Sequence, residues 1–141
     1  ATDIIVGFPG ETDEDFDESL AYTKDMNFSQ IHVFRYSMRP GTAAASMPNQ
    51  ILKDVKATRS AAMQEVAQNG QKTFQESILG QKFEILWEQS TEETAHGFWW
   101  QGLTDSYIRV KTLAPRDLKG RILSVQLKKI GTDGLIEATL L

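Results

Sequence analysis

The sequence has no cysteine among its 141 residues and only two histidines. Without thiols, these residues can form no disulfide, no thiolate zinc site, no cysteine nucleophile and no cysteine-bound iron–sulfur cluster. The histidines, His32 and His96, lie far apart and lack the spacing of metal ligands. No apolar run approaches the roughly 18 residues of a membrane-spanning helix. We therefore expect no metal site and no membrane partner.

The chain does not open with a basic segment followed by an apolar one, which is the pattern of a secretory signal. The first residue is Ala1 rather than methionine, and a strand-like run follows it directly. These features predict a cytoplasmic protein that is an internal piece of a longer chain. At 15.8 kDa, with 40% hydrophobic and 24% charged residues, it has the size and composition of one globular domain or of two small ones.

The acidic excess is confined to the first half of the chain. Residues 1–79 hold 7 Lys and Arg against 11 Asp and Glu, which accounts for the whole net charge of −4. Residues 80–141 hold 8 of each and are neutral. Neither half is the strongly basic module that would indicate nucleic-acid binding by charge alone.

The first 36 residues follow a strand, helix, strand pattern. Residues 3–8 form a β-branched run without polar alternation, which favours a strand buried on both faces of a parallel sheet. Thr12 and Asp15 have capping-box spacing, so we expect a helix over residues 13–26. Residues 31–36 form a second strand. The three elements predict one parallel, right-handed βαβ unit.

A loop over residues 37–50 and a long helix over residues 51–78 follow. Two prolines and a glycine argue against regular structure at the ends of the loop. A loop of this length within a compact domain is usually functional or disordered. Gly70 is expected to interrupt or kink the helix.

After Gly80 the hydrophobic period changes to two, as in strands that bury one face. Five short strands separated by polar turns predict a small closed barrel of OB-like size, over residues 83–88, 97–102, 107–112, 122–128 and 135–140. We expect Ile108 and Val110 to face inward. The fold class is therefore α/β plus all-β, with domains over residues 1–76 and 77–141.

Two segments of the first half are candidates for ligand binding. Gly7 and Gly10 lie in the turn between a buried strand and a capped helix, where the backbone can approach a ligand closely. The alternative is a plain strand-to-helix turn, and the segment matches neither a Walker loop nor the dinucleotide glycine fingerprint. Arg39, held by Pro40, can present a fixed fork to a carboxylate or a phosphate, or it is simply solvated on a surface loop.

Four stretches of the chain resemble the radical SAM methylthiotransferase family. Residues 2–12, with Asp15 and Phe16, resemble a late motif of its barrel, and residues 34–44 match its Phe-x-Tyr-Ser-x-Arg-Pro-Gly-Thr-x-Ala segment. Lys56 and Arg59 match its Lys-x-x-Arg helix. Residues 102–110 resemble the core signature of its C-terminal TRAM domain.

The resemblance implies the last part of a radical SAM (β/α) barrel, with one βαβ unit and a long helix, joined to a five-stranded TRAM barrel. The run from Thr104 to Val110 is most similar to the branch that methylthiolates threonylcarbamoyl-adenosine in tRNA, although Ser106 stands where that branch commonly has Asn. The implied enzyme is a transferase that uses SAM and two 4Fe-4S clusters. Because the cluster cysteines are missing, this fragment should hold neither cluster and should be inactive alone, with no catalytic residue of its own. The implied cofactor-binding residues are Val6, Gly7, Pro9, Gly10 and Tyr36.

The second half carries a candidate RNA face. Tyr107, Arg109 and Lys111 share one face of their expected strand, and of Trp99 and Trp100 only one can point inward. Cations for phosphates and aromatic rings for bases are what an RNA-binding barrel combines. The alternative is that the tryptophans are core residues and the cations only confer solubility. With the TRAM resemblance, we expect RNA contact by Arg39, Trp99, Trp100, Tyr107, Arg109 and Lys111.

The sequence therefore predicts part of a tRNA methylthiotransferase acting on an adenosine near the anticodon. Its expected partners are tRNA and the missing N-terminal part of the same enzyme. Unpaired strand edges of the incomplete barrel also predict dimerisation or strand exchange of the isolated chain. The alternatives are a non-catalytic docking barrel and the branch of the family that modifies a ribosomal protein.

Overall fold

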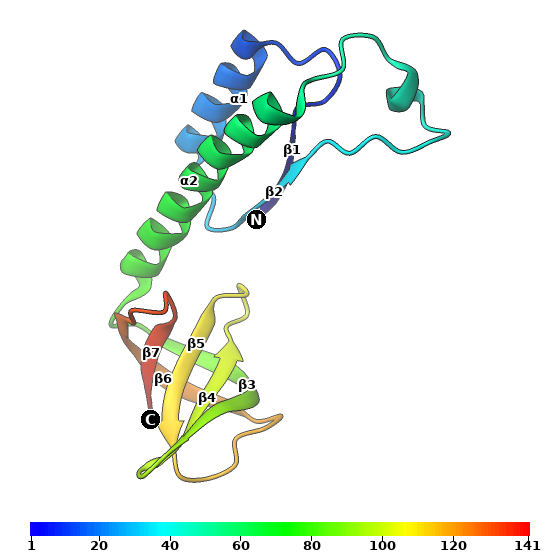
Figure 1. The fold of residues 1–141 in the computed structure, drawn as a ribbon. Coiled ribbons are helices and arrows are strands. Elements are labelled where there is room, and N and C mark those ends of the chain that lie inside the picture. Colours follow the sequence, from blue (N-terminus) through cyan, green and yellow to red (C-terminus); the bar gives the residue numbers. More distant parts are fainter. The chain divides into compact units, whose positions relative to one another are not determined.

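The computed structural model describes all 141 residues and is of mixed α/β type (Figure 1). It divides into two compact units, Ala1–Phe74 and Gln75–Leu141. The first is an α/β unit, and the second is a β-barrel. None of the helices combines the length with the apolar character that crossing a membrane requires.

The α/β unit begins with the expected strand, helix, strand sequence. Strand β1 (Thr2–Val6) pairs in parallel with β2 (Ile31–Arg35), and α1 (Asp13–Met26) connects them. The capping box is present, since Thr12 Oγ1 accepts a hydrogen bond from Asp15 N at 3.1 Å, and Asp15 accepts one from Thr12 N at 2.9 Å. The bond from the Thr12 backbone lowers the pKa of Asp15. The expected bounds of this helix are confirmed.

Replacing Thr12 with alanine is expected to destabilise the α/β unit by about 1 kcal/mol, because the N-cap hydroxyl satisfies a helix N–H that otherwise lacks a partner. Urea unfolding followed by circular dichroism at 222 nm measures this loss, since helices dominate that signal. Thr58→Ala is the matched control: this exposed hydroxyl donates to the Asp54 carbonyl within α2, so no capping bond is lost. Equal losses in both variants would contradict the capping role.

The long helix α2 (Lys53–Ile78) continues through Gly70, so the expected interruption is wrong. A Cβ at position 70 would overlap the carbonyl oxygen of Phe28. Position 70 therefore requires glycine because α2 packs closely against the backbone of Phe28. This glycine does not end the helix. Before α2, a short 3-10 helix η1 (Ala43–Ser46), capped by Thr42, lies within the expected loop.

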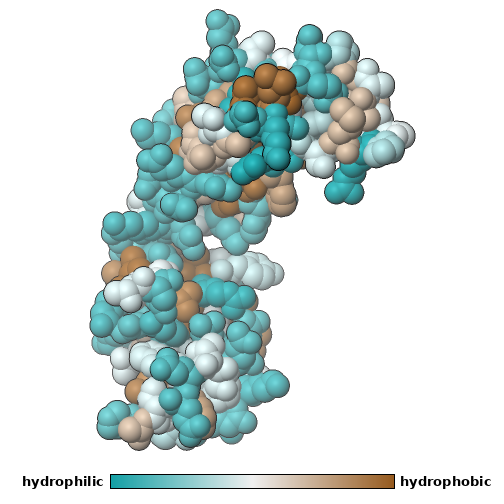
Figure 2. All heavy atoms as spheres, in the orientation of Figure 1, coloured by the Kyte–Doolittle hydropathy of each residue, from teal (hydrophilic) through white to brown (hydrophobic).

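The core of the α/β unit lies between one face of the two-stranded sheet and the helices. Val6, Phe16 and Met63 form its buried centre, and partly buried residues surround them: Ile4, Leu20, Val33 and Ala62. The opposite face of the sheet exposes Ile5 and Phe34. The prediction of strands buried on both faces is therefore wrong for this chain, because its helices cover only one face. Figure 2 shows hydrophobic side chains at the surface of this unit.

The second unit is a closed barrel of five strands in the order β3-β4-β5-β7-β6. All neighbours are antiparallel except β5 and β7, and this order is that of an OB-like barrel. The strands are β3 (Lys82–Thr94), β4 (Gly97–Leu103), β5 (Arg109–Ala114), β6 (Ile122–Ile130) and β7 (Ile136–Leu140). The expected five-stranded barrel is confirmed, although β3 ends at Thr94 rather than at Glu88.

Alternating side chains fill the barrel. Ile108 and Val110 are buried as expected, and on β4 the buried Trp100 alternates with Gly102. The other three strands, β3, β6 and β7, also contribute fully buried side chains: Ile85, Trp87, Val125, Leu127 and Ile136. The remaining side of each strand forms the outer surface, which carries the candidate RNA residues Trp99, Arg109 and Lys111.

Candidate functional site

The carboxyl ends of β1 and β2 meet at one edge of the α/β unit, where the expected cofactor residues lie. The parallel register ends with Val6 opposite Arg35, and Tyr36 N donates to Val6 O at 2.8 Å. Loops that follow parallel strands share this edge, which is the usual ligand-binding edge of such sheets. We call the segments Gly7–Glu11 and Tyr36–Thr42 the rim.

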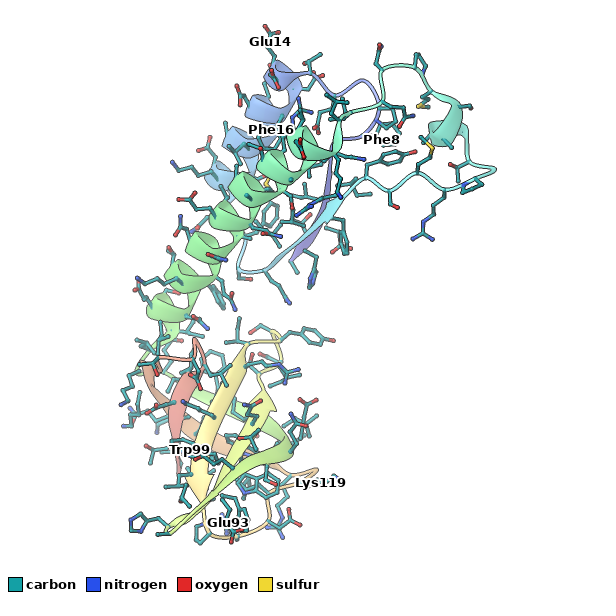
Figure 3. All side chains as sticks on the ribbon, in the orientation of Figure 1. Phe8, Glu14, Phe16, Glu93, Trp99 and Lys119 are labelled. Carbon is teal, nitrogen blue, oxygen red and sulfur yellow. The ribbon has the colours of Figure 1, made fainter.

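The first rim segment is a tight, glycine-dependent turn. Gly7 and Gly10 have φ of 75° and 87°, a region that other residues rarely adopt. Glu11 N donates to Phe8 O at 3.0 Å, and the Glu11 carboxylate accepts from Gly7 N at 2.9 Å. This glutamate therefore closes the turn from its far end. Pro9 is buried, and Phe8 extends outward from the loop (Figure 3).

Two basic side chains of α2 hold the rim in place. Lys56 Nζ donates to Tyr36 O at 3.1 Å, and its stem lies so close to Gly7 that an added Cβ would overlap Lys56 Cγ. Arg59 donates to the Glu11 carboxylate at 2.6 Å, to the Glu11 carbonyl at 3.1 Å and to Asp13 at 2.7 Å. The Lys-x-x-Arg spacing thus connects α2 to both rim segments.

Arg59 is one of the few buried charges of the chain. Its side chain is 7% exposed and that of Glu11 is 13% exposed, whereas Asp13 is 93% exposed. Burial disfavours the charged guanidinium, but the bonds to Asp13 and Glu11 outweigh this and raise the pKa of Arg59. The guanidinium also lies over the Phe16 ring, with Cζ 5.6 Å from its centroid.

Two further rim residues were expected to bind ligands. The Tyr36 ring packs edge-on against Phe8, with centroids 5.4 Å apart, and its hydroxyl is buried without a hydrogen-bond partner. Arg39 is exposed, and its carbonyl accepts from Thr42 Oγ1 at 2.8 Å in a turn where Gly41 has a φ of 83°. The backbone of the Arg39 turn is thus fixed, while its side chain reaches solvent.

On the barrel, the expected face of three residues is not continuous. Tyr107 lies before β5, in a turn in which its own φ is 62°. The Thr104 hydroxyl closes this turn by accepting a hydrogen bond from Ile108 N. Tyr107 is exposed but does not align with Arg109 and Lys111 on a strand. Trp100 is only 5% exposed and points into the barrel, so its expected role as an RNA-stacking residue is wrong. Trp99 is the outward one of the pair (Figure 3).

The two cations on β5 are already paired with carboxylates. Arg109 lies 3.1 Å from Glu88, and Lys111 lies 2.7 Å from Asp133 and 3.4 Å from Glu137. Burial disfavours the Lys111 charge, but the hydrogen bonds and opposite charges of Asp133 and Glu137 together outweigh this and raise the pKa of Lys111. The hydrogen bond from Lys111 lowers the pKa of Asp133. Lys111 therefore has a structural role in the barrel.

The structure identifies an outer hollow that sequence reasoning missed. It measures 470 Å³ and opens on the face formed by β4, β5, β6 and β7. Its lining residues are Trp99, Thr112, Leu113, Lys128, Lys129, Glu137, Ala138, Thr139 and Leu140, and we call it the Trp99 hollow. The only sequence signal for the hollow is the pair Lys128 and Lys129 on β6. Regular alternation would turn one of these two lysines into the barrel, which is unfavourable for a charge.

No protein-family model matches the chain, but curated proteins do. It is 36% identical over 130 residues to threonylcarbamoyladenosine tRNA methylthiotransferase MtaB of Bacillus subtilis (strain 168), which covers 92% of this chain and 29% of that protein. It is 43% identical over 86 residues to tRNA-2-methylthio-N(6)-dimethylallyladenosine synthase of Ehrlichia chaffeensis, covering 61% of this chain and 20% of that protein. The same enzyme of Agrobacterium fabrum is 42% identical over 87 residues, or 62% of this chain and 19% of that protein.

The chain spans less than a third of the length of these relatives and matches their C-terminal region. The similarity includes both units, because 130 residues exceed the length of either one. The chain is therefore a homologue of the C-terminal region of these tRNA methylthiotransferases.

Proposed function

We propose that this chain is part of an enzyme that methylthiolates an adenosine near the anticodon of tRNA. The observation that carries the proposal is the 36% identity to a tRNA methylthiotransferase over 92% of the chain. The relatives named above are all tRNA enzymes, so we propose neither an independent docking barrel nor the branch that modifies a ribosomal protein. A cytoplasmic location follows from a tRNA substrate.

Within that enzyme, the α/β unit would complete one side of a SAM-binding barrel. The rim offers glycine backbone at Gly7 and Gly10, the buried wall of Val6 and Pro9, and the unpaired hydroxyl of Tyr36. These groups fit a wall against which a polar organic cofactor packs. SAM bound there would supply the adenosyl radical, and the chain's own contribution would be to hold the wall rigid through Lys56 and Arg59.

The 4Fe-4S clusters do not fit this part of the enzyme, because the chain offers no thiolate ligand. We propose that the ligands come from the N-terminal part of the enzyme, and that the edges of β1 and β2 pair there with further strands. Dimerisation of the isolated chain through those edges stays a prediction. It is checked by sedimentation at several concentrations.

The second unit would dock the tRNA. An OB-like barrel with a half-buried tryptophan and lysines on its outer face is a common platform for single-stranded nucleic acid. The unit is close to neutral, so docking would depend on where its charges lie rather than on their sum.

The docking role is tested by the binding of this 141-residue chain to a labelled anticodon stem-loop RNA. We expect anisotropy to report binding that weakens as salt rises from about 50 to about 200 mM, because phosphate contacts release counterions. A fully paired RNA duplex of the same length is the control, since it lacks unstacked bases. Absence of binding at the lowest salt would contradict the docking role.

The branch of the family is tested with the complete enzyme. We propose the threonylcarbamoyl-adenosine branch, because that relative aligns over 92% of the chain and the others over about 61–62%. Activity on tRNA that carries threonylcarbamoyl-adenosine, with none on tRNA that carries dimethylallyl-adenosine, is the expected result. The reverse preference would assign the enzyme to the other branch.

A further inference from the structure

We propose that the Trp99 hollow is a subsite for one unpaired nucleotide, with the base stacked on Trp99 and the phosphate held by Lys128 and Lys129. This inference rests on the proposed RNA docking by the barrel and specifies where it occurs. It moves the RNA-binding residues away from the Tyr107, Arg109 and Lys111 set that the sequence predicts.

The hollow arises where two neighbouring strands stop pairing. The parallel strands β5 and β7 are joined at only two positions, Val110 with Ile136 and Lys111 with Glu137. Beyond them, the Thr112 hydroxyl donates to Ala138 O at 2.8 Å, and no further ladder pair follows. The opening therefore exposes strand edges beside Thr139 and Leu140, which offers a base edge both hydroxyl and backbone partners.

Trp99 forms the aromatic wall of the hollow. Alternation on β4 directs it outward because Trp100 fills the barrel interior, and Leu113 faces it across the β4–β5 ladder. Lys111 Nζ lies 5.1 Å from the Trp99 ring centroid and is itself held by Asp133 and Glu137. The indole is thus fixed before any ligand arrives, and a rigid, half-exposed ring is a suitable stacking surface.

A β-bulge places two lysines at the hollow. Val125 and Leu127 point inward on β6, so regular alternation would turn Lys129 inward as well. The register with β7 shifts between Leu127 and Lys129, and both Lys128 and Lys129 are exposed as a result. Bulges re-aim side chains in this way.

The charge balance of the hollow is positive although the barrel as a whole is not. Its lining has two lysines and one carboxylate, Glu137, which lies 3.2 Å from Lys129 and 3.4 Å from Lys111. The Lys129 side chain is 71% exposed, so it remains available to a phosphate. An apolar wall, a carboxylate that accepts amino groups and adjacent ammonium groups together fit a nucleotide better than an acidic or apolar peptide.

The test uses the complete chain and single-stranded RNA hexamers. Trp87 and Trp100 are buried, so quenching of the tryptophan fluorescence by the RNA is expected to come from Trp99. A hexamer with the same backbone but no bases should bind more weakly and quench little. Trp99→Ala should raise the Kd for the normal hexamer about tenfold, since stacking contributes roughly 1–3 kcal/mol per base. Trp99→Phe, which keeps a ring, should lose less.

The lysines are tested by the salt dependence of the same binding. Lys128→Gln and Lys129→Gln should each lower the slope of log Kd against log salt by about 1, the effect of losing one phosphate contact. Lys119→Gln, in the exposed loop before β6, is the charge-matched control, and Tyr107→Ala is the aromatic control. Both controls should bind within about twofold of the parent chain, and circular dichroism verifies the fold of every variant.

The possible outcomes separate the two proposals. If the parent chain binds no RNA, the docking role itself is wrong. If it binds, but Tyr107→Ala weakens binding while Trp99→Ala and both lysine variants leave it unchanged, docking stands and the subsite is overturned. The subsite would also be overturned if the normal hexamer and the hexamer without bases gave equal quenching and equal affinity, because the contact would then be purely electrostatic.

Discussion

Replacing Arg59 with methionine is expected to destabilise the α/β unit by about 3–5 kcal/mol, the typical cost of removing one partner from a buried ion pair. The Glu11 carboxylate, whose side chain is 13% exposed, would lose its charged partner. The backbone carbonyl of Glu11 would lose the hydrogen bond that Arg59 donates to it. Methionine conserves much of the apolar stem, so the loss measures the charge and its bonds rather than a cavity. The rim would lose its connection to α2 at the same time.

Two spectroscopic signals separate the units in this experiment. All three tryptophans belong to the barrel, whereas α1 and most of α2 belong to the α/β unit. Urea unfolding of Arg59→Met should therefore show an early transition at 222 nm and an unchanged transition in tryptophan fluorescence. Lys53→Met, an exposed position on the same helix, is the control and should leave both transitions in place.

A second variant identifies which acid matters. Glu11→Gln should lose nearly as much stability as Arg59→Met, because the amide would leave the buried guanidinium with only the exposed, solvent-screened Asp13 as a charged partner. Asp13→Asn should change little, since its side chain is 93% exposed and solvent screens the pair. Equal effects of the two acid variants, or a normal transition in Arg59→Met, would contradict the buried pair as the support of the rim.

The local signals of the α/β unit were sufficient to predict its elements. A capping box, first-turn acids and helical spacing predicted α1 with the bounds that the structure has. The role of Arg59 was not predictable in this way, because its partners Glu11 and Asp13 are distant in sequence and meet it only after packing. Gly70 was misread for the same reason, since the need for glycine there comes from the Phe28 carbonyl and not from the helix.

In the barrel, periodicity predicted the strands but not their ends or their exceptions. The polar run from Gln89 to Thr94 shows no alternation, yet it extends β3 because β4 pairs with it. The Thr104 hydroxyl removes Tyr107 from β5. The bulge that exposes Lys129 is likewise a product of pairing between β6 and β7. The candidate face therefore shifted to Trp99 and the two lysines, residues whose environment only the closed barrel defines.

Barrel closure itself depends on the absence of a side chain at Gly102. A Cβ there would lie 2.5 Å from Leu86 O, 2.6 Å from Ile85 Cγ2 and 3.0 Å from Trp87 Cε3. All three atoms belong to β3, and Ile85 and Trp87 are fully buried, so none can move away without disturbing the packed interior. On β4 the large Trp100 and the absent side chain of Gly102 together fit the width of the barrel.

Gly102→Val is accordingly expected to destabilise the barrel by about 3 kcal/mol, the upper range of overpacking costs, and Gly102→Ala by less. Valine has a higher strand propensity than glycine, which by itself would stabilise β4. Any loss of stability in Gly102→Val therefore comes from crowding inside the barrel. Ser124→Val, on the exposed side of β6, adds comparable bulk outside the barrel and should be nearly neutral. The loss should appear in the tryptophan fluorescence transition and not at 222 nm. A barrel that tolerates valine at position 102 would mean that β3 and β4 separate there, and the closed order of five strands would need revision.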